Sequence, residues 1–229
     1  MTKMQYYGAG FPYIEKEDFP GKLIVLEGND GVGRSTQIQL LRSYLEESGY
    51  GVSDTGLKRS ELTQPGLDAA KEGHTLGPLT MSLFYATDFA DRLENQIIPA
   101  LKAGFIVLSD RYFFSTIARD MVRGASSDWA KNLYGFALIP DMIFYLKADV
   151  NTLVTRIIHG RGFNYWEAGM DIMKAGNLYD NFVEYQGNLT EQFNKMVKEY
   201  CMIEIDANCP VQDVFEELKE NIATLFAQD

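Results

Sequence analysis

The segment from Gly28 to Thr36 has the residue types and the spacing of a loop that binds phosphate groups. Four residues separate Gly28 from Gly33, and Arg34 and Ser35 follow directly. The usual pattern has Lys where this chain has Arg34. Glycines let the backbone curl so that successive N–H groups converge on phosphate oxygens, and a helix starting at Gly33 would direct its positive end at the same anion.

We expect a bound phosphate to contact most of this segment, namely Gly28, Asn29, Gly31, Val32, Gly33, Arg34, Ser35 and Thr36. The Ser35 hydroxyl can coordinate a Mg²⁺ ion that bridges phosphates. Arg34 keeps the positive charge of Lys, but its planar fork favours a bidentate contact. Arg34 is therefore expected to hold phosphate while positioning it less well for transfer. The alternative is a Gly-rich turn without a ligand, and the agreement of apolar strand, glycine spacing and helix onset argues against it.

Short apolar runs alternate with helical patterns along the chain. Continuous apolar runs bounded by turns are typical of strands buried on both faces of a parallel sheet. They occupy residues 23–26, 105–108, 142–146 and 202–205, with a weaker candidate around Val52. The helical patterns cover 35–47, 78–103, a stretch after Ser115, 150–159, 177–200 and 211–227. This order predicts an α/β fold, a doubly wound parallel sheet of about five strands with helices on both faces, of the P-loop NTPase type.

Composition limits the partners. The 229 residues suffice for one large domain, with or without a lid, and the formal net charge of −11 disfavours a nucleic acid polymer as partner. Cys201 and Cys209 show no disulfide or zinc spacing, which fits a reducing compartment. No apolar run reaches membrane-spanning length, so we expect a cytoplasmic protein without membrane contact. Residues 1–20 are expected to form an aromatic N-terminal extension, either packed on the domain of residues 21–229 or serving as a contact surface.

A second motif, Asp110-Arg111-Tyr112, follows the apolar run at 105–108. Together with the Gly-rich loop, it resembles the thymidylate kinase family of P-loop nucleoside monophosphate kinases, of which this chain would be a divergent member. Further matching runs lie at 83–86, 140–146 and 203–207, so the resemblance covers most of residues 21–225. It implies transfer of the γ-phosphoryl group of ATP, with Mg²⁺, to a deoxynucleoside monophosphate, nominally dTMP to dTDP.

The resemblance also implies roles for single residues. Asp110 would organise Mg²⁺ together with Ser35, Arg111 would hold the acceptor phosphate, and Asp30 would help to place the acceptor. An ordinary ion pair between Asp110 and Arg111 at the strand end is the alternative. Phe84 stands where the family stacks an aromatic ring on the acceptor base, although core packing is the default for a helical Phe. Ser115 and Arg119 are also counted among the substrate-binding residues.

The family closes a lid with basic residues over the donor phosphates. We expect this lid near residues 156–176, with Arg161 as its catalytic arginine. The alternative is that the basic residues of this region, Arg156, His159 and Arg161, merely offset the dipole at a helix end.

Several residues depart from the family pattern. Thr63-Gln64-Pro65-Gly66 replaces a stretch whose Arg contacts the acceptor phosphate, so that charge is lost unless Lys58 or Arg59 supplies it. Asp88 stands where the family has a base-reading Arg, and Arg92 lies one turn further. If Asp88 faces the base, a base offering donors would suit it or Asp120 better than thymine; alternatively, Asp88 and Arg92 pair with each other. Tyr165-Trp166-Glu167 replaces an Asp-Arg pair of many bacterial lids.

Three functions remain open at this point. The first is the nucleoside monophosphate kinase just described, with activity lowered by Arg34. The second is a nucleotide-binding relative with weak or no kinase activity, and the third is a kinase for a different nucleotide acceptor. By analogy with the family we expect a homodimer, for which the apolar stripes at 84–93 and 129–138 are candidate contacts.

Overall fold

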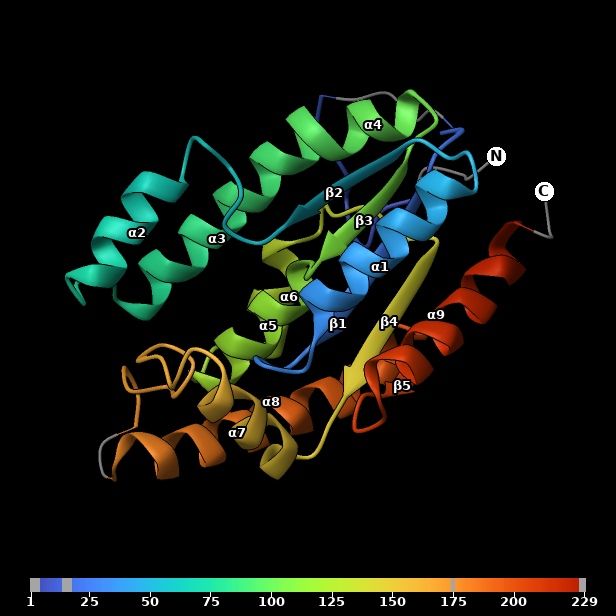
Figure 1. Cartoon of the computed structure of the whole chain (residues 1–229). Helices are drawn as coiled ribbons and strands as arrows, with labels where there is room; N and C mark the ends of the chain where they lie inside the picture. Colours follow the sequence, from blue (N-terminus) through green and yellow to red (C-terminus); the bar gives the residue numbers. More distant parts are fainter. Residues whose placement is uncertain (1–4, 14–17, 174–175, 227–229) are drawn as a thin grey trace.

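The computed structural model describes residues 5–13, 18–173 and 176–226. At its centre lies a sheet of five parallel strands in the order β2-β3-β1-β4-β5 (Figure 1). The strands are β1 (Lys22–Gly28), β2 (Val52–Gly56), β3 (Ile106–Asp110), β4 (Met142–Lys147) and β5 (Ile203–Asp206). Four of them lie where apolar runs predicted strands, β2 begins at the weaker candidate around Val52, and the predicted doubly wound α/β fold is confirmed.

Successive residues of the central strands pack into two different cores, one on each face of the sheet. In β1, Leu23 and Val25 belong to one buried cluster, whereas Ile24 and Leu26 belong to the other. Side chains alternate between the faces of a strand, so a strand covered on both faces is apolar throughout. This is why the strands appear in the sequence as continuous apolar runs.

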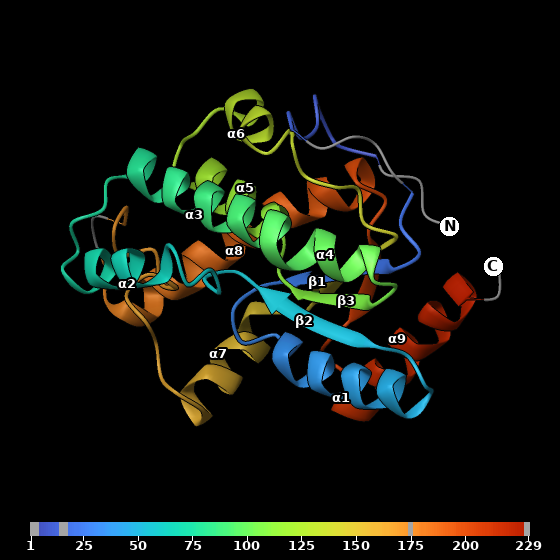
Figure 2. The same cartoon turned by 90° about the horizontal axis from the view of Figure 1, so that it is seen from above.

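Helices cover both faces of the sheet (Figure 2). One face carries α1 (Arg34–Glu47), α7 (Val150–His159) and α9 (Val211–Phe226). The other carries α3 (Pro78–Arg92), α4 (Ile98–Lys102), α5 (Phe113–Val122) and α8 (Leu178–Glu199). The predicted helices 35–47, 150–159 and 177–200 are confirmed to within one residue at each end, while residue 227, the predicted end of the last helix, lies outside the described residues. None of the described helices is both long and apolar enough to cross a lipid bilayer.

The predicted single helix over 78–103 is interrupted. A π-helical turn, η1 (Leu93–Ile97), lies between α3 and α4. Pro99 follows this turn, and a proline has no backbone N–H and crowds the carbonyl group four residues earlier. The wider turn accommodates that defect without ending the helix.

Two short helices were not predicted. They are α2 (Gln64–Glu72) and α6 (Ser127–Leu133). The signals were present at their starts, because Pro65 occupies the first turn of α2 and the Ser126 hydroxyl accepts a hydrogen bond from the backbone N–H of Trp129. Helices of this length are too short to show a clear apolar periodicity, which is why the pattern missed them.

The described part of the N-terminal segment packs against the domain. The Tyr7 ring makes edge contacts with Phe113, Phe114 and Tyr200, with centroid distances of 5.1, 5.8 and 5.4 Å. Its backbone N–H donates to the Ala137 carbonyl oxygen at 3.1 Å. Residues 1–4 and 14–17 of the expected extension lie outside the described residues.

The sheet brings the chemically interesting segments to one edge. Asp110, the last residue of β3, is level with Leu26 of β1 and with Gly56, the last residue of β2. The Gly-rich loop after β1, Asp110 and the segment after β2 therefore meet at the carboxyl ends of the strands, where ligands of such sheets bind.

Candidate functional site

The loop between β1 and α1 has the geometry of a phosphate-binding loop. Gly28 has φ +146°, and a Cβ atom there would lie 2.4 Å from the Leu146 carbonyl oxygen. Gly33 has φ +105° and is the N-cap of α1, with no side chain capping the helix in this fully described stretch. The first N–H groups of α1 are therefore open to an anion from outside the helix.

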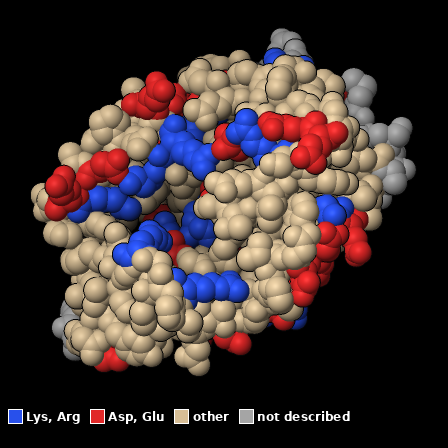
Figure 3. Space-filling view, in the orientation of Figure 1, with Lys and Arg blue, Asp and Glu red and all other residues tan. Residues whose placement is uncertain are grey.

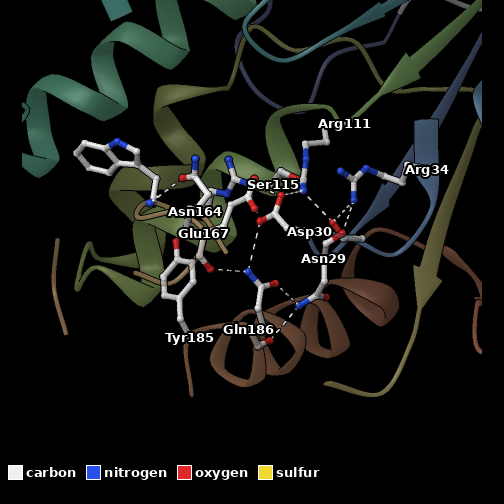
Figure 4. Close-up of polar contacts among 12 residues, drawn as sticks. Asn29, Asp30, Arg34, Arg111, Ser115, Asn164, Glu167, Tyr185 and Gln186 are labelled. Carbon is white, nitrogen blue, oxygen red and sulfur yellow. Dashed lines mark hydrogen bonds and ion pairs between the residues drawn. The ribbon is translucent and has the colours of Figure 1, made fainter. Parts of the chain in front are cut away.

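Arg34, the first residue of α1, turns its guanidinium back over this loop (Figure 4). Its Nη1 donates to the carbonyl oxygens of Gly28 and Asn29 at 2.7 and 2.5 Å. Its Nε donates to Asp110 Oδ1 at 2.8 Å. The planar guanidinium makes several contacts at once, as expected. Its partners in this structure are the loop carbonyls and Asp110.

Ser35 and Asp110 form a pair of oxygen groups that suits Mg²⁺. Ser35 Oγ donates to Asp110 Oδ2 at 2.9 Å, which places hydroxyl and carboxylate together beside the loop. Burial acts to raise the pKa of Asp110, but Arg34 and Arg111 outweigh it and hold that pKa below its usual value. Among the described residues no cluster of three or more His, Cys, Asp or Glu could hold a metal ion. A Mg²⁺ ion here would therefore need nucleotide phosphates and water as its other ligands.

Asp30 lies at the centre of a second charged group (Figure 4). It accepts a hydrogen bond from Arg111 Nη2 at 2.6 Å and from Arg119 Nη2 at 3.1 Å. Burial acts to raise the pKa of Asp30, yet the two arginines hold it well below its usual range. Burial, together with Arg34, lowers the pKa of Arg111 to about 10. Arg111 thus pairs with Asp30, so the alternative of an Asp110–Arg111 ion pair is not what forms.

Glu27 supports this group and was missed in the sequence. It is wholly buried, and its carboxylate accepts hydrogen bonds from the backbone N–H groups of Tyr112 and Ser115 and from Ser115 Oγ. Ser115 Oγ in turn accepts from Arg111 Nη1 at 2.7 Å. Burial raises the pKa of Glu27. A single acid at the end of an apolar strand, directly before Gly28, was the signal that could have identified it.

The predicted lid region reaches across to α2. Trp166 Nε1 donates to the Lys71 carbonyl oxygen at 3.2 Å, and the Lys71 ammonium lies 5.5 Å from the centroid of the Trp166 ring. The rings of Tyr165 and His74 pack with their centroids 4.0 Å apart. Arg161 forms an ion pair with Glu167 at 2.7 Å. Residues 174 and 175 of the expected lid lie outside the described residues.

A cavity of about 630 Å³ lies between the end of β3, α2, α5 and the predicted lid region. Positive charge dominates its walls: eight Lys or Arg residues line it against four Asp or Glu. Figure 3 shows Lys and Arg side chains gathered around the hollow on this face of the molecule. The cationic lining residues are Arg34, Lys58, Arg59, Lys71, Arg111, Arg119, Arg123 and Arg161.

Comparison with known proteins identifies the scaffold that carries this site. The family model described as Thymidylate kinase matches residues 26–218. The chain belongs to the thymidylate kinase family. A probable thymidylate kinase 2 of Saccharolobus solfataricus is 39% identical over 202 residues, covering 87% of this chain and 94% of that protein. A probable thymidylate kinase of Thermococcus gammatolerans (30%, covering 91% and 97%) and the thymidylate kinase of Caldicellulosiruptor saccharolyticus (30%, covering 90% and 97%) are also similar.

The predicted base-reading residues of this thymidylate kinase relative are not brought to the cavity. Asp88 and Arg92 are both wholly buried and form the i, i+4 ion pair at 3.0 Å, which was the alternative interpretation. Phe84 packs against the small core cluster of Leu67, Met81 and Tyr85 and does not line the cavity. An apolar environment cannot accept a lone carboxylate, so Asp88 turns to Arg92 and to nearby N–H groups instead of to a ligand.

Other predicted residues do reach the cavity. Arg34, Asp110, Arg111, Arg119 and Arg161 all line it, whereas the Thr63–Gly66 stretch does not. Asp120 lines it as well, its Oδ1 accepts from Ser82 Oγ at 2.7 Å, and burial raises its pKa. The lining residues that sequence reasoning missed include Lys71, Tyr85 and Arg123. Nothing in their spacing distinguishes them from ordinary helical residues.

Proposed function

We propose that the protein transfers the γ-phosphoryl group of ATP to dTMP, with Mg²⁺, giving ADP and dTDP. One observation carries this proposal: Arg34 of the phosphate-binding segment and Asp110 line a cavity of about 630 Å³ together with Arg111, which Asp30 holds. Such a cavity has room for a nucleotide, and the two groups can face a donor and an acceptor phosphate at once. The names of the similar proteins support thymidylate as the acceptor.

The donor side is assigned to the β1–α1 loop. N–H groups from Gly28 to Thr36 would hold the β- and γ-phosphates, and Ser35 and Asp110 would hold Mg²⁺. The bound ion would supply positive charge for the oxygens of the transferring group. An acceptor phosphate oxygen forms the new bond to the γ-phosphorus while the bond from that phosphorus to the bridging β,γ-oxygen breaks, which leaves ADP.

The acceptor side is assigned to the charged group around Asp30. Arg111 is held by Asp30 and by Ser115 Oγ, so its guanidinium is oriented before a ligand arrives. Phosphoryl transfer depends chiefly on such positioned charge. The cationic cavity of a protein with formal net charge −11 would also attract a dianionic nucleotide locally while the rest of the surface repels polyanions.

The lid, the assembly and the location belong to the same proposal. Residues 156–176 would act as a lid, with Arg161 on the donor phosphates. Within the two apolar stripes that were candidate dimer contacts, Phe89, Leu93 and Tyr134 are buried in the core and cannot serve. Trp129 on α6 is exposed, as are Leu79 and Leu83 on α3 just before the first stripe, and these side chains support a homodimer. Cys201 and Cys209 are exposed thiols outside any disulfide, which supports a cytoplasmic location.

A coupled ADP-release assay tests the proposal. Mg-ATP is offered with a panel of ribo- and deoxynucleoside monophosphates, beside a calorimetric titration of ATP. Turnover that is highest with dTMP is the expected result. ATP binding without turnover on any monophosphate would support the nucleotide-binding alternative, and turnover highest with another monophosphate would support the third function.

A further inference from the structure

Asp88 holds the segment that follows β2 in place. This residue lies within α3 and is wholly buried. Its Oδ2 accepts a hydrogen bond from the backbone N–H of Lys58 at 3.2 Å, and its Oδ1 accepts one from the backbone N–H of Ser60 at 3.0 Å. Thr63 Oγ1 also donates to Oδ1, at 3.4 Å. One carboxylate thus anchors residues 58–63 at three points.

Arg92 is the counter-charge of this carboxylate in the protein interior. Arg92 Nε lies 3.0 Å from Asp88 Oδ2, and the exposed fraction of both side chains is 0%. A buried carboxylate needs both a counter-charge and hydrogen-bond donors. Arg92 provides the charge, and the segment after β2 provides most of the donors.

The anchored segment has a backbone shape that ordinary residues avoid. Lys58 has φ +62°, in the left-handed region. A side-chain-bearing residue keeps this conformation only where its surroundings enforce it. The hydrogen bonds that the backbone N–H groups of Lys58 and Ser60 donate to Asp88 are the restraint that the structure shows.

The result of this anchoring is that Lys58 and Arg59 line the cavity. A Cβ atom built on Gly56 would lie 3.3 Å from both Arg59 Nε and Asp110 Cβ, so Arg59 crosses the end of β2 beside Asp110. Lys58 pairs with Asp68 and Arg59 with Asp54, and both cations remain partly exposed. Two departures from the family pattern are therefore coupled. Asp88 stands in place of an Arg, and it fixes the segment whose Lys58 and Arg59 can replace the charge missing from the Thr63–Gly66 stretch.

We propose that Asp88 is a positioning residue for the acceptor phosphate, which it serves by holding residues 58–63 so that Lys58 and Arg59 face that phosphate. This inference rests on the proposed function, since it assigns the cavity to a nucleoside monophosphate. Asp88 itself touches no substrate. Asp88 does not read the base, because it does not line the cavity; it acts through Lys58 and Arg59, which do.

Equilibrium binding of dTMP and of thymidine, each measured by calorimetry, tests the proposal. In Asp88→Asn the amide cannot accept from all the present donors, so residues 58–63 lose their anchor. The dTMP dissociation constant should rise at least about tenfold, while those of thymidine and ATP stay within about twofold. The control Glu94→Gln neutralises an exposed acid two residues after Arg92 and should leave all three constants unchanged.

A double-mutant cycle separates positioning from general damage. Lys58→Met with Arg59→Met should weaken dTMP binding about tenfold or more without affecting thymidine, and adding Asp88→Asn to that pair should change dTMP binding less than about twofold. Equal losses for thymidine and dTMP, or a full effect of Asp88→Asn in the paired background, would overturn the proposal.

The wild-type protein supplies a further test that does not require the Asp88 variant to fold. Amide hydrogen exchange at Lys58 and Ser60 should be slow, and fast exchange at both would overturn the anchoring. If wild type binds dTMP but transfers no phosphoryl group, only the proposed function fails. If wild type binds no nucleoside monophosphate, both fail.

Discussion

Arg34 Nε lies 2.8 Å from Asp110 Oδ1, with the two side chains 10% and 12% exposed. The first residue of the phosphate-binding helix is thus paired with the carboxylate that we assign to Mg²⁺. Nη1 of the same guanidinium holds two carbonyl oxygens of the loop. A nucleotide and its metal ion must compete with these contacts for both groups.

Replacing this arginine by lysine should therefore increase turnover. In Arg34→Lys the shorter point charge cannot bridge the loop carbonyls and Asp110 together, so Asp110 becomes available to Mg²⁺. We expect kcat to rise about tenfold, equivalent to about 1.4 kcal/mol, and the Mg²⁺ concentration for half-maximal ATP binding to fall. Arg34→Met is the matched control and should lower kcat. A lower kcat in Arg34→Lys would mean that the bidentate fork is itself required.

The buried Asp30 should make stability depend on pH in a defined direction. Burial acts to raise its pKa, but Arg111 and Arg119 hold it below the unfolded value of about 3.9. Its stabilising contribution is therefore complete above about pH 5 and is lost as the pH falls through and below about 4.

Asp30→Asn should accordingly destabilise the protein by about 3–5 kcal/mol at pH 7, because the buried Arg111 and the partly buried Arg119 lose their partner. Urea unfolding should show the difference from wild type shrinking by about 1 kcal/mol between pH 6 and pH 3. Glu184→Gln, an exposed site on α8, should stay within about 0.5 kcal/mol of wild type at each pH. A difference that does not vary with pH would contradict the ion-pair account.

Trp166 should control access to the cavity. Trp166 lies in the predicted lid, and its indole N–H and ring both contact Lys71 of α2, which also lines the cavity. Trp166→Leu removes a hydrogen bond and a cation–π contact worth about 1–2 kcal/mol together, so the KM for the acceptor should rise about 5- to 30-fold. Trp166→Phe keeps a ring without the N–H, so its KM for the acceptor should lie between those of the wild type and Trp166→Leu. Steady-state kinetics at saturating ATP would show this order, and equal KM values in all three proteins would exclude the contact from acceptor binding.

Arg161 should act on the donor side instead. It pairs with Glu167, but its own side chain is 60% exposed and lines the cavity. We expect Arg161→Met to raise the KM for ATP about tenfold and to leave the KM for the acceptor within about twofold. Lys131→Met on α6 removes the charge of a residue that does not line the cavity and should change neither value. If only the KM for the acceptor rises, Arg161 acts on the acceptor side and the assignment to the donor side is wrong.

The parts predicted from sequence are those with a short-range physical signal. Runs such as Leu23–Leu26 must be apolar because both faces of the strand are covered, and Gly28 must be glycine because a Cβ would strike Leu146. Asp110 follows from its place at a strand end. The apolar strand, the glycine and the acid at the strand end can each be recognised from residues adjacent in the chain, because each role depends on the strand to which the residue belongs.

The parts that were missed depend on distant contacts. Asp88 matches a base-reading position by alignment, yet its partners Lys58 and Ser60 lie about thirty residues away in the chain. Its burial, which no local pattern reveals, decides that it faces them and not the cavity. Lys71 likewise lines the cavity in contact with Trp166, which lies 95 residues away in the chain.

Transfer of labelled phosphate tests the central claim most directly. Wild-type protein is incubated with [γ-³²P]ATP, Mg²⁺ and dTMP, and the products are separated. The account predicts label in dTDP, none when dTMP is omitted, and a loss of about a hundredfold or more in Asp110→Asn, which removes the carboxylate that we assign to Mg²⁺. Label that remains in ATP, or appears only as free phosphate, would contradict a thymidylate kinase activity for this protein.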